Sequence, residues 1–554
     1  MIRLHGIAAA PGVVVARPQR LEHGEPGANG PALDLDAAVA QAVAELETVA
    51  ERMAATGRGA EAAIFEAQAL LAADEELLAP ARSAIADGAA VDAAIVAAGE
   101  LVAVALESLD DEILAGRGAD ARDVAQRIAR ASRGEPAPRL TERVVVVARD
   151  LAPSVTADLD RDLLAGIALE AGSRTSHAAI LARALEIPAV LGVPGLLAAL
   201  PGVREMVVDG GTGEIVLDPD DAERHRASDA AVRHRAAASA DEALREQPLR
   251  TSDGHTVMLG ANIGGPDDAA RAIAAGAQAV GLLRTEFTFV DRGVEPDEAT
   301  QVAAYASVLR QFGSRPVVMR LIDVGGDKPL AYLPLAPESN PFLGVRAIRL
   351  ARRSPDLLTT QLRAMLRAAL ATGVSAPRIM APMVADLADL RMVRHLLEEA
   401  MAVVDAPLDP QLGIMVEVPS AVLVADRLAA EAAFFSVGTN DLTQYLLAAD
   451  RTNPDLAASQ DPLHPAVLRA IAQLTTAARR AAVPVAVCGE MAADPAGAVL
   501  LVGLGIDELS MDPSAFGAVK RALGGVTLDR TRELAALALD LDDAVAVRQL
   551  VEAG

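Results

Sequence analysis

Residues 434–441, Phe-Phe-Ser-Val-Gly-Thr-Asn-Asp, form a short apolar run that leads directly into two polar side chains, Asn440 and Asp441. Apolar segments of this length, rich in β-branched and aromatic residues, are typical of buried strands. From residue 251 onward such segments alternate with helical stretches. Eight of them can be counted, at about residues 256–262, 279–284, 316–322, 378–382, 413–417, 434–438, 484–488 and 505–510.

Eight strand–helix units in residues 251–554 predict a (β/α)8 barrel of the TIM type rather than an open sheet. Six of the eight segments run directly into unusual polar residues. Side chains that follow the strands of such a barrel meet at one mouth, where catalysis takes place, so we expect these residues to lie together. They are Asn262, Arg284 with Glu286, Arg320 with Asp323, Glu417, Asn440 with Asp441, and Cys488 with Glu490.

The residue types at this predicted mouth indicate a metal-bound phosphate. Arg284, Arg320 and Arg346 follow strands or short glycine turns and offer planar guanidinium groups for one phosphate. Glu417 and Asp441 offer hard oxygen ligands without accompanying Cys or His, which suits Mg²⁺ rather than zinc. Each of these residues alone is more commonly a surface or ion-pairing group, and only their joint position at strand ends indicates a site.

Cys488 is the one cysteine in the sequence and has two interpretations. By residue type alone it is a small buried apolar side chain. Its place between an apolar strand and Gly489-Glu490 also suits a proton donor to an enolate carbon, because an ordinary thiol is mostly protonated at neutral pH.

One cysteine excludes an internal disulfide, and the first residues lack the uncharged apolar core of a signal peptide, so we expect a cytoplasmic location.

The N-terminal part of the chain has a different pattern. From about residue 34 to 134, apolar residues recur at three- and four-residue intervals among charged ones, which predicts several amphipathic helices. Strand-like segments come before and after them, at 7–17, 143–149, 166–170 and 205–209. The expected domains are an α/β unit at 1–33 and 139–222, an inserted helical bundle at 34–138, a helical linker at 223–250 and the barrel at 251–554.

Residues 172–183, GSRTSHAAILAR, join a strand to an amphipathic helix that should end before Pro188. Ser176 or Thr175 can cap this helix, which places His177 in its first turn. There the free backbone N–H groups and the positive end of the helix dipole would stabilise a phosphorylated imidazole. The alternative is a surface or capping histidine, and the segment alone does not decide between the two.

The charge of the chain excludes some partners. With 50 basic and 76 acidic residues the formal net charge is −26, so the summed field repels nucleic acids and anionic membranes, and any phosphate site must be local. The most apolar long stretch, at about 82–106, contains Asp87, Asp92 and Glu100 and does not read as a membrane span. We therefore expect no nucleic-acid partner and no direct membrane insertion.

Several motifs together resemble those of enzyme I of the bacterial sugar phosphotransferase system, the phosphoenolpyruvate-protein phosphotransferases among the phosphoenolpyruvate-utilising enzymes. The resemblance extends over essentially the whole chain. Some of the motifs also suit pyruvate phosphate dikinase and phosphoenolpyruvate synthase, but the length, domain order and helical insertion favour enzyme I. The motifs are GSRTSHAAILARALEIPAVLG, GLLRTEF, DVGGDKP, NPFLGVRAIR, GIMVEVPSA, FFSVGTNDLTQYLLAADR and VCGEMA.

This resemblance implies that His177 takes the phosphoryl group of phosphoenolpyruvate and passes it to a histidine of the small carrier protein HPr, with release of pyruvate. That reaction is the first general step of sugar uptake by the system. The implied roles are phosphate binding by Arg284, Arg320 and Arg346 with Asn440 and Arg451, Mg²⁺ binding by Glu417 and Asp441, lining of the site by Lys328, protonation of enolpyruvate by Cys488, and support of the histidine ring by Thr156.

The resemblance further implies a homodimer joined through the barrel, an HPr-docking surface on the inserted helices, and a swivelling α/β unit. Two positions depart from the family pattern. Ser173 stands where a second glycine is usual, and Gln68 stands where many relatives carry a histidine in the region expected to face HPr.

Two other functions fit parts of the sequence. A dikinase or synthase would need a glycine-rich nucleotide-binding domain before the histidine segment, and neither such a domain nor a P-loop pattern is found. A non-catalytic sensor of phosphoenolpyruvate would have no need for a nucleophile, metal ligands and a thiol together.

Overall fold

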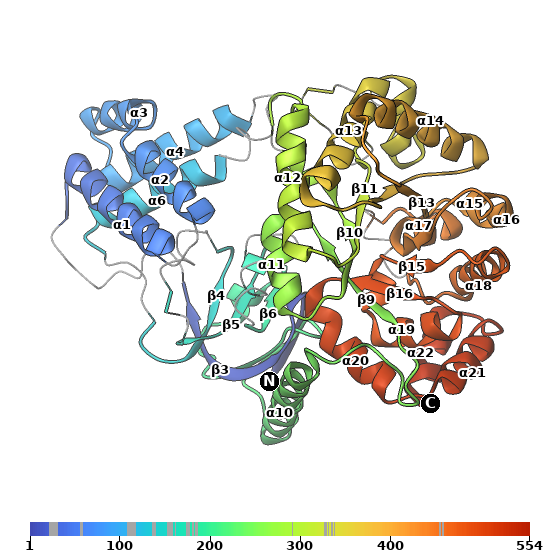
Figure 1. The fold of residues 1–554 in the computed structure, drawn as a ribbon. Helices are drawn as coiled ribbons and strands as arrows, with labels where there is room; N and C mark the ends of the chain where they lie inside the picture. Colours follow the sequence, from blue (N-terminus) through green and yellow to red (C-terminus); the bar gives the residue numbers. More distant parts are fainter. Residues whose placement is uncertain are drawn as a thin grey trace. The chain divides into compact units, whose positions relative to one another are not determined.

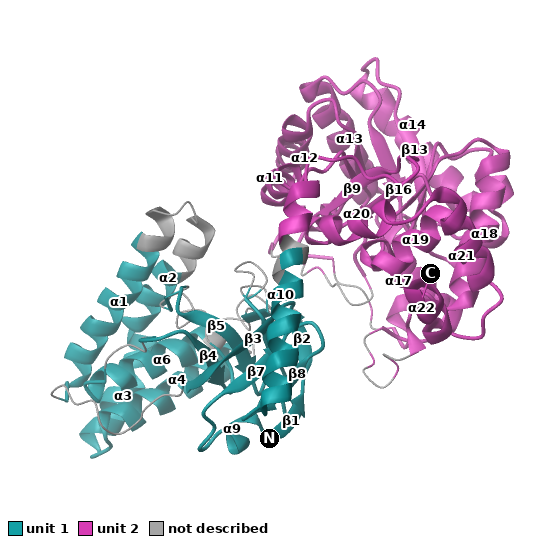
Figure 2. Cartoon of the chain, turned by 90° about the horizontal axis from the view of Figure 1, so that it is seen from below, with its two compact units in different colours: residues 1–236 teal, residues 237–554 magenta. Residues whose placement is uncertain are grey.

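The computed structural model divides into two compact units, residues 1–236 and 237–554 (Figure 2). It describes residues 1–21, 32–55, 59–107, 118–135, 140–151, 159–172 except 161, 178, 179, 182, 187–325 except 291, 330, 332, 333, 336, and 338–553 except 452, 454, 455, 457 and 458. The boundary between the units falls inside helix α10 (Asp221–Leu244), in the segment predicted as a helical linker.

An eight-stranded sheet organises the first unit, in the order β1-β8-β7-β3-β4-β5-β6-β2. The central strands β4 and β5 are parallel and buried along their whole length, and successive valines of β4 alternate between two apolar cores. This is the pattern of a sheet covered on both faces. The strands are β1 (Ile2–His5), β2 (Ile7–Ala10), β3 (Val13–Arg20), β4 (Val144–Ala148), β5 (Leu164–Leu169), β6 (Ala189–Leu191), β7 (Met206–Asp209) and β8 (Glu214–Leu217).

The N-terminal strand pairs with the later strands, as a single α/β unit formed by 1–33 and 139–222 requires, since β3 lies parallel to β4 and antiparallel to β7. The short strands β1, β6 and β8 were not predicted. Of the amphipathic helix expected to contain His177 and to end before Pro188, only residues 178, 179 and 182 are described, and they are helical. The rest of that helix lies outside the described residues.

A helical bundle is inserted between the adjacent strands β3 and β4 (Figure 1). Leu46, Leu77, Ile95 and Ile128 from four different helices are fully buried in its core. The insertion predicted from the sequence is therefore present. Its helices are α1 (Leu35–Ala55), α2 (Gly59–Ala72), α3 (Glu75–Ala86), α4 (Val91–Glu107) and α6 (Gly118–Ser132).

Gln68 does not lie on the surface of this bundle. Its side chain is 1% exposed and its Nε2 donates to Asp120 Oδ1 at 2.7 Å, between α2 and α6. Residue 68 of this chain therefore joins two helices in the interior, and the docking surface expected on the inserted helices stays a prediction.

The second unit is a closed barrel of eight parallel strands in the order β9 to β16, with β16 pairing back to β9. Helices surround the strands (Figure 1). Every strand predicted from the sequence is present within a few residues. The strands are β9 (Met258–Ile263), β10 (Ala279–Leu283), β11 (Val317–Arg320), β12 (Arg378–Ala381), β13 (Gln411–Val416), β14 (Phe435–Val437), β15 (Val485–Val487) and β16 (Glu508–Met511).

The main core of the barrel unit lies between the strands and the surrounding helices, and a second apolar layer fills the barrel itself. Some of the long helices begin with side-chain caps, such as Asp297 before α12 and Asp386 before α14. The helices used below are α12 (Glu298–Phe312), α13 (Pro355–Thr372), α14 (Leu387–Val404), α17 (Thr439–Leu447), α18 (Pro465–Arg480), α19 (Pro495–Gly503), α20 (Phe516–Gly524), α21 (Leu528–Ala538) and α22 (Ala544–Ala553).

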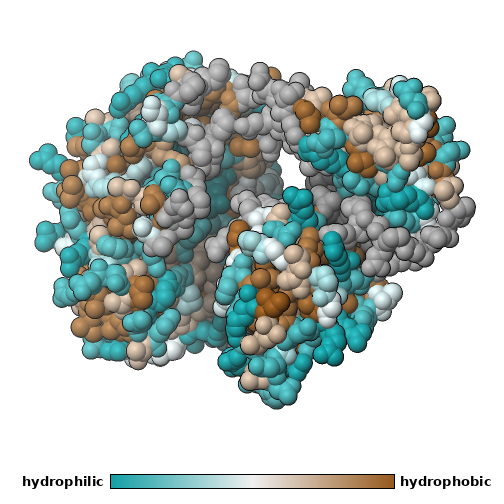
Figure 3. Space-filling model, turned by 180° about the vertical axis from the view of Figure 1, so that it is seen from behind, coloured by the Kyte–Doolittle hydropathy of each residue, from teal (hydrophilic) through white to brown (hydrophobic). Residues whose placement is uncertain are grey.

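Within the described residues, no helix combines the length and apolar character needed to cross a bilayer. On the face drawn in Figure 3, hydrophobic residues form separate areas between hydrophilic ones.

Candidate active site at the barrel mouth

Polar side chains collect at the carboxyl ends of the barrel strands. Arg320 ends β11, Glu417 follows β13 and Cys488 follows β15. Asn440 and Asp441 lie in the first turn of α17, directly after β14. Because all eight strands run parallel, these residues of distant sequence positions share one mouth, as predicted.

Arg320 is buried and held by two carboxylates. Its Nη2 donates to Glu286 Oε1 at 2.8 Å, and its Nη1 lies 3.3 Å from Asp323 Oδ2. Burial acts to lower the pKa of Arg320, but Glu286, Asp323 and Glu417 together raise it above its ordinary value. Its Nε is buried without a hydrogen-bond partner in the described part of the chain, so the cation keeps one N–H for an anion.

Arg346 and Arg451 meet at Asp441. The Nη1 of Arg346 donates to Asp441 Oδ1 at 3.1 Å, and the Nη1 of Arg451 donates to Oδ2 at 3.2 Å. Arg346 also forks onto Asp323, with Nη2 at 3.0 and 2.9 Å from the two carboxylate oxygens. The ring of Phe342 lies 5.9 Å from the guanidinium carbon of Arg346 and 5.2 Å from that of Arg451. The positive charges of these two arginines are thus balanced by the carboxylates of Asp441 and Asp323.

Glu417 is 1% exposed, and its Oε1 accepts from the backbone N–H of Met383 at 2.6 Å. Burial, followed by the charges of Asp441 and Asp323, raises the pKa of Glu417 to about 8. A Cβ on Gly438 would come within 2.9 Å of Glu417 Oε2, so the glycine keeps space beside this oxygen. Hard carboxylate oxygens that repel one another, with room beside them, fit a divalent cation such as Mg²⁺.

Cys488 is 5% exposed in the apolar layer inside the barrel, beside Met415 and Phe434. Its thiol donates to Val437 O at 3.6 Å. Burial raises the pKa of Cys488 to about 11, which keeps the thiol protonated at neutral pH. Both interpretations of this residue are therefore compatible with its surroundings, since it is buried and also lies at the mouth.

Asn440 and Arg284 present donors to the mouth. Asn440 Oδ1 accepts from the N–H of Glu490 at 2.9 Å, and its NH₂ group has no partner within the described residues. The side chain of Arg284 is exposed and likewise makes no hydrogen bond or ion pair with the described part of the chain. Both donors are available to an anion.

Three of the predicted site residues, Thr156, His177 and Lys328, lie outside the described residues. Among the residues that are described, no group of three or more His, Cys, Asp or Glu side chains could hold a metal ion. A cation bound by Glu417 and Asp441 would therefore need further oxygens from substrate or water.

Sequence reasoning missed Phe342 and Tyr445. The hydroxyl of Tyr445 donates to Phe342 O at 2.5 Å, which fixes the turn that carries the ring over the two arginines. A signal was present, because Tyr445 lies one helical turn after Asp441 and Phe342 lies four residues before Arg346.

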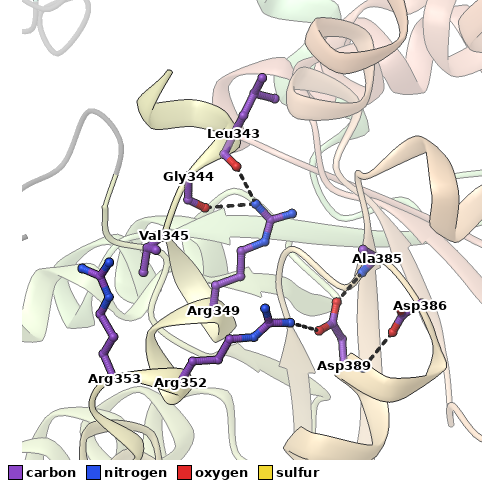
Figure 4. Close-up of a pocket in the computed structure, with 9 residues that line it drawn as sticks. All are labelled: Leu343, Gly344, Val345, Arg349, Arg352, Arg353, Ala385, Asp386 and Asp389. Carbon is purple, nitrogen blue, oxygen red and sulfur yellow. Dashed lines mark hydrogen bonds and ion pairs between the residues drawn. The ribbon is translucent and has the colours of Figure 1, made fainter. Parts of the chain in front are cut away.

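A cavity of about 470 Å³ lies next to the loop that carries Arg346 (Figure 4). Two of the three arginines in its wall have partners: Arg349 Nη1 donates to Leu343 O and Gly344 O, both at 3.0 Å, and Arg352 Nη2 lies 3.6 Å from Asp389 Oδ1. The contacts of Arg349 brace the backbone of Leu343 and Gly344 and so help to set the position of Arg346.

Comparison with known proteins places this site in a family. Residues 238–527 match the PEP-binding domain of the PEP-utilising enzymes, 140–213 their mobile domain and 5–117 their N-terminal domain. The chain is 38% identical to the phosphoenolpyruvate-protein phosphotransferase of Geobacillus stearothermophilus, with 99% of this chain and 97% of that protein covered. It is 41% identical to the protein of the same name from Streptomyces coelicolor, with 99% and 98% covered.

It is also 41% identical to a multiphosphoryl transfer protein of Xanthomonas campestris, with 98% of this chain and 66% of that protein covered. The chain therefore spans somewhat less than two thirds of that longer relative. With all three domains matched in order and near-complete coverage of the shorter relatives, the chain belongs to the PEP-utilising enzymes and, within them, to the phosphoenolpyruvate-protein phosphotransferases.

Proposed function

We propose that this chain transfers the phosphoryl group of phosphoenolpyruvate to its own His177 and then to a histidine of the carrier protein HPr, releasing pyruvate. The observation that carries the proposal is the cluster of Arg320, Arg346, Asp441 and Glu417 beside Cys488 at one barrel mouth. The names of the relatives support the donor and the transfer to a protein.

The charges of the mouth support a trianionic substrate bound with a divalent cation. Besides Lys328, the four arginines Arg284, Arg320, Arg346 and Arg451 carry four positive charges. Four carboxyl groups oppose them, from Glu286, Asp323, Glu417 and Asp441, once Glu417 ionises to bind a cation. Phosphoenolpyruvate alone would leave this buried cluster strongly negative, which is unfavourable in a low dielectric. With Mg²⁺ the net addition is about one negative charge.

In the proposed complex, Arg284, Arg320 and Arg346 bind the phosphate, with Asn440 and Arg451 assisting and Lys328 lining the site. Glu417 and Asp441 would hold Mg²⁺, whose chemistry would be to neutralise charge on the phosphate and carboxylate oxygens. Arg320 is suited to this role because it is already positioned by Glu286 and Asp323 and keeps a buried N–H without a partner in the described part of the chain.

The transfer breaks the bond between phosphorus and the enol oxygen and forms a bond between phosphorus and a ring nitrogen of His177, with Thr156 supporting the ring. The enolate left behind needs one proton on carbon. The Cys488 thiol would supply it, with breaking of S–H and formation of C–H, and the thiolate would then recover a proton from water. Its raised pKa favours the protonated starting state.

The test is incubation of the full chain with phosphoenolpyruvate and Mg²⁺, followed by mass spectrometry that preserves phosphohistidine. We expect an adduct of about 80 Da on His177, the mass of one phosphoryl group, and its loss in His177→Ala. Addition of HPr should discharge the adduct, while a variant HPr without its acceptor histidine should not. Pyruvate release without any adduct on the chain would refute the proposal.

Two further parts of the proposal concern assembly and location. We propose a homodimer joined through the barrel and a cytoplasmic location, as the resemblance implies. Sedimentation of the chain with and without Mg²⁺ and phosphoenolpyruvate tests the dimer. A monomer under all of these conditions would contradict it.

A further inference from the structure

The side-chain amide of Asn262, on β9, donates one hydrogen bond and accepts another across the barrel. Its Nδ2 donates to the backbone carbonyl of Cys488 at 2.8 Å, and its Oδ1 accepts from Ser510 Oγ at 2.8 Å. Ser510 lies on β16, the strand between β9 and the strand that leads to Cys488. The bond from Asn262 therefore reaches past one whole strand to hold the residue after β15.

The backbone on either side of the thiol is held at three points by three separate elements. Besides the bond from Asn262, the N–H of Cys488 donates to Val437 O at 3.0 Å, and the N–H of Glu490 donates to Asn440 Oδ1 at 2.9 Å. Gly489 packs so closely on the turn before α17 that a Cβ there would come within 2.6 Å of Thr439 N. Of these three contacts, only the bond from Asn262 is made to the carbonyl group of Cys488.

Two glycines leave space in the barrel for the side chain of Ser510. A Cβ on Gly260 would lie 3.0 Å from Ser510 Oγ, and one on Gly281 would overlap the same side chain. These glycines allow the fully buried Ser510 to stand inside the barrel and reach the amide. A polar group in such a place is stabilising only when its hydrogen bonds are made, and both of these are. Asn262 thus uses its amide oxygen and one of its two N–H groups inside the protein.

We propose that Asn262, held in place by Ser510, is a positioning residue that fixes the direction from which the Cys488 thiol delivers its proton to the enolate carbon. This inference rests on the proposed function. A neutral amide suits the task because it donates and accepts at once and does not titrate in the working pH range. Without it, the carbonyl of Cys488 loses its partner and the thiol can turn away from one face of the enolate.

The test uses the full chain, in which Cys488 is the one cysteine, so thiol reagents report on this residue alone. Three quantities are measured in Asn262→Ala and Ser510→Ala. They are the rate of alkylation by N-ethylmaleimide, kcat and KM for pyruvate formation, and the face of proton addition, read from phosphoenolpyruvate carrying deuterium at one C3 position in tritiated water.

For Asn262→Ala we expect a kcat lower by about tenfold with KM within about twofold, faster alkylation and loss of facial selectivity. Ser510→Ala should show the same changes at about threefold, because the amide remains but is held at one end only. Since Ser510→Ala removes a single hydroxyl, it remains informative if Asn262→Ala fails to fold.

Gln278→Ala is the matched control, because Gln278 Oε1 accepts from the N–H of Leu259 at 3.1 Å, a similar bond at the other end of β9. It should lower stability without changing alkylation or facial selectivity. Wild-type alkylation rate and selectivity in both Asn262→Ala and Ser510→Ala would overturn the proposal. If the unaltered chain forms no pyruvate, the proposed function fails. The positioning of Cys488 is still tested by alkylation in that case, and an unchanged alkylation rate in both variants would overturn it.

Discussion

Arg346 and Asp441 form a buried ion pair, with 3.1 Å between Nη1 and Oδ1, although the chain separates them by 95 positions. In the proposed function the first binds phosphate and the second binds Mg²⁺. Each therefore neutralises the other in the absence of ligands, and both must exchange partners when substrate and cation bind. The charges of this pair therefore cancel each other when neither ligand is bound.

This pairing predicts that phosphoenolpyruvate and Mg²⁺ bind cooperatively, because each ligand releases the partner that the other requires. We expect Mg²⁺ to tighten phosphoenolpyruvate binding by at least about tenfold in isothermal titration at constant ionic strength. Arg346→Ala should weaken binding strongly, whereas Arg352→Ala, which alters an exposed arginine of the neighbouring loop, should not. Equal affinity with and without Mg²⁺ would contradict the coupling.

Glu286 is predicted to support catalysis by stabilising the guanidinium of Arg320 in its position at the mouth. In Glu286→Gln the buried guanidinium loses the charge of its 2.8 Å partner, and we expect kcat/KM to fall by about a hundredfold. Glu298→Gln is the control, because Glu298 pairs with Arg363 and Arg367 on the helical layer rather than at the mouth. That variant should lose stability and keep its activity. A Glu286→Gln enzyme with unchanged kcat/KM would remove Arg320 from the proposed phosphate site.

The barrel and its mouth were predictable because the strands are short and apolar and six of the eight run into polar residues. This pattern can be recognised in each segment separately. The pairing of Arg346 with Asp441 was not predictable, since it depends on how two loops fold toward each other. The burial of Gln68 was not predictable either. Helix α2 is apolar nearly all round, so its pattern does not reveal which side is buried, and Leu70 is 76% exposed while Gln68 is 1% exposed.

Cys488 should react as a thiol with a high pKa. Since burial raises its pKa to about 11, the thiolate fraction, and with it the alkylation rate, should rise about tenfold per pH unit between pH 8 and pH 10. A plateau below pH 9 would show that the thiol ionises near its ordinary value.

Cys488→Ser should slow pyruvate formation by about a hundredfold, because a hydroxyl is a much weaker acid, while leaving the phosphorylation of His177 detectable.

Phe342 is expected to hold the two arginines at the mouth. Phe342→Leu removes the ring from both guanidinium groups, and we expect KM for phosphoenolpyruvate to rise by about three- to tenfold with a smaller change in kcat. Phe312→Leu is a close control, because Phe312 stacks with Arg315 at 5.3 Å at the end of α12. It should lower stability and leave KM unchanged. Equal effects of the two substitutions on KM would mean that Phe342 acts only through packing.

Glu508 should make the stability of the barrel depend on pH. Its Oε1 is buried without a partner among the described residues, and burial raises the pKa of Glu508 to about 7, above its ordinary value near 4.5. Because the folded state binds this proton more tightly than the unfolded state, the stabilising contribution of the protonated carboxyl is full below about pH 4.5 and is lost as the pH rises through 7.

Glu508→Gln removes that titration. Relative to the unaltered chain, the variant should gain stability as the pH rises from 5 to 8, by at most about 3 kcal/mol, read from the unfolding of the barrel in urea. Glu533→Gln changes an exposed carboxylate paired with Arg530 and should show no such trend. Since Glu508 begins β16, at the end of the strand opposite the mouth, kcat should stay unchanged. A stability difference that is constant with pH would mean that Glu508 is ionised in the folded barrel, and its carboxylate would then need a partner that the described residues do not supply.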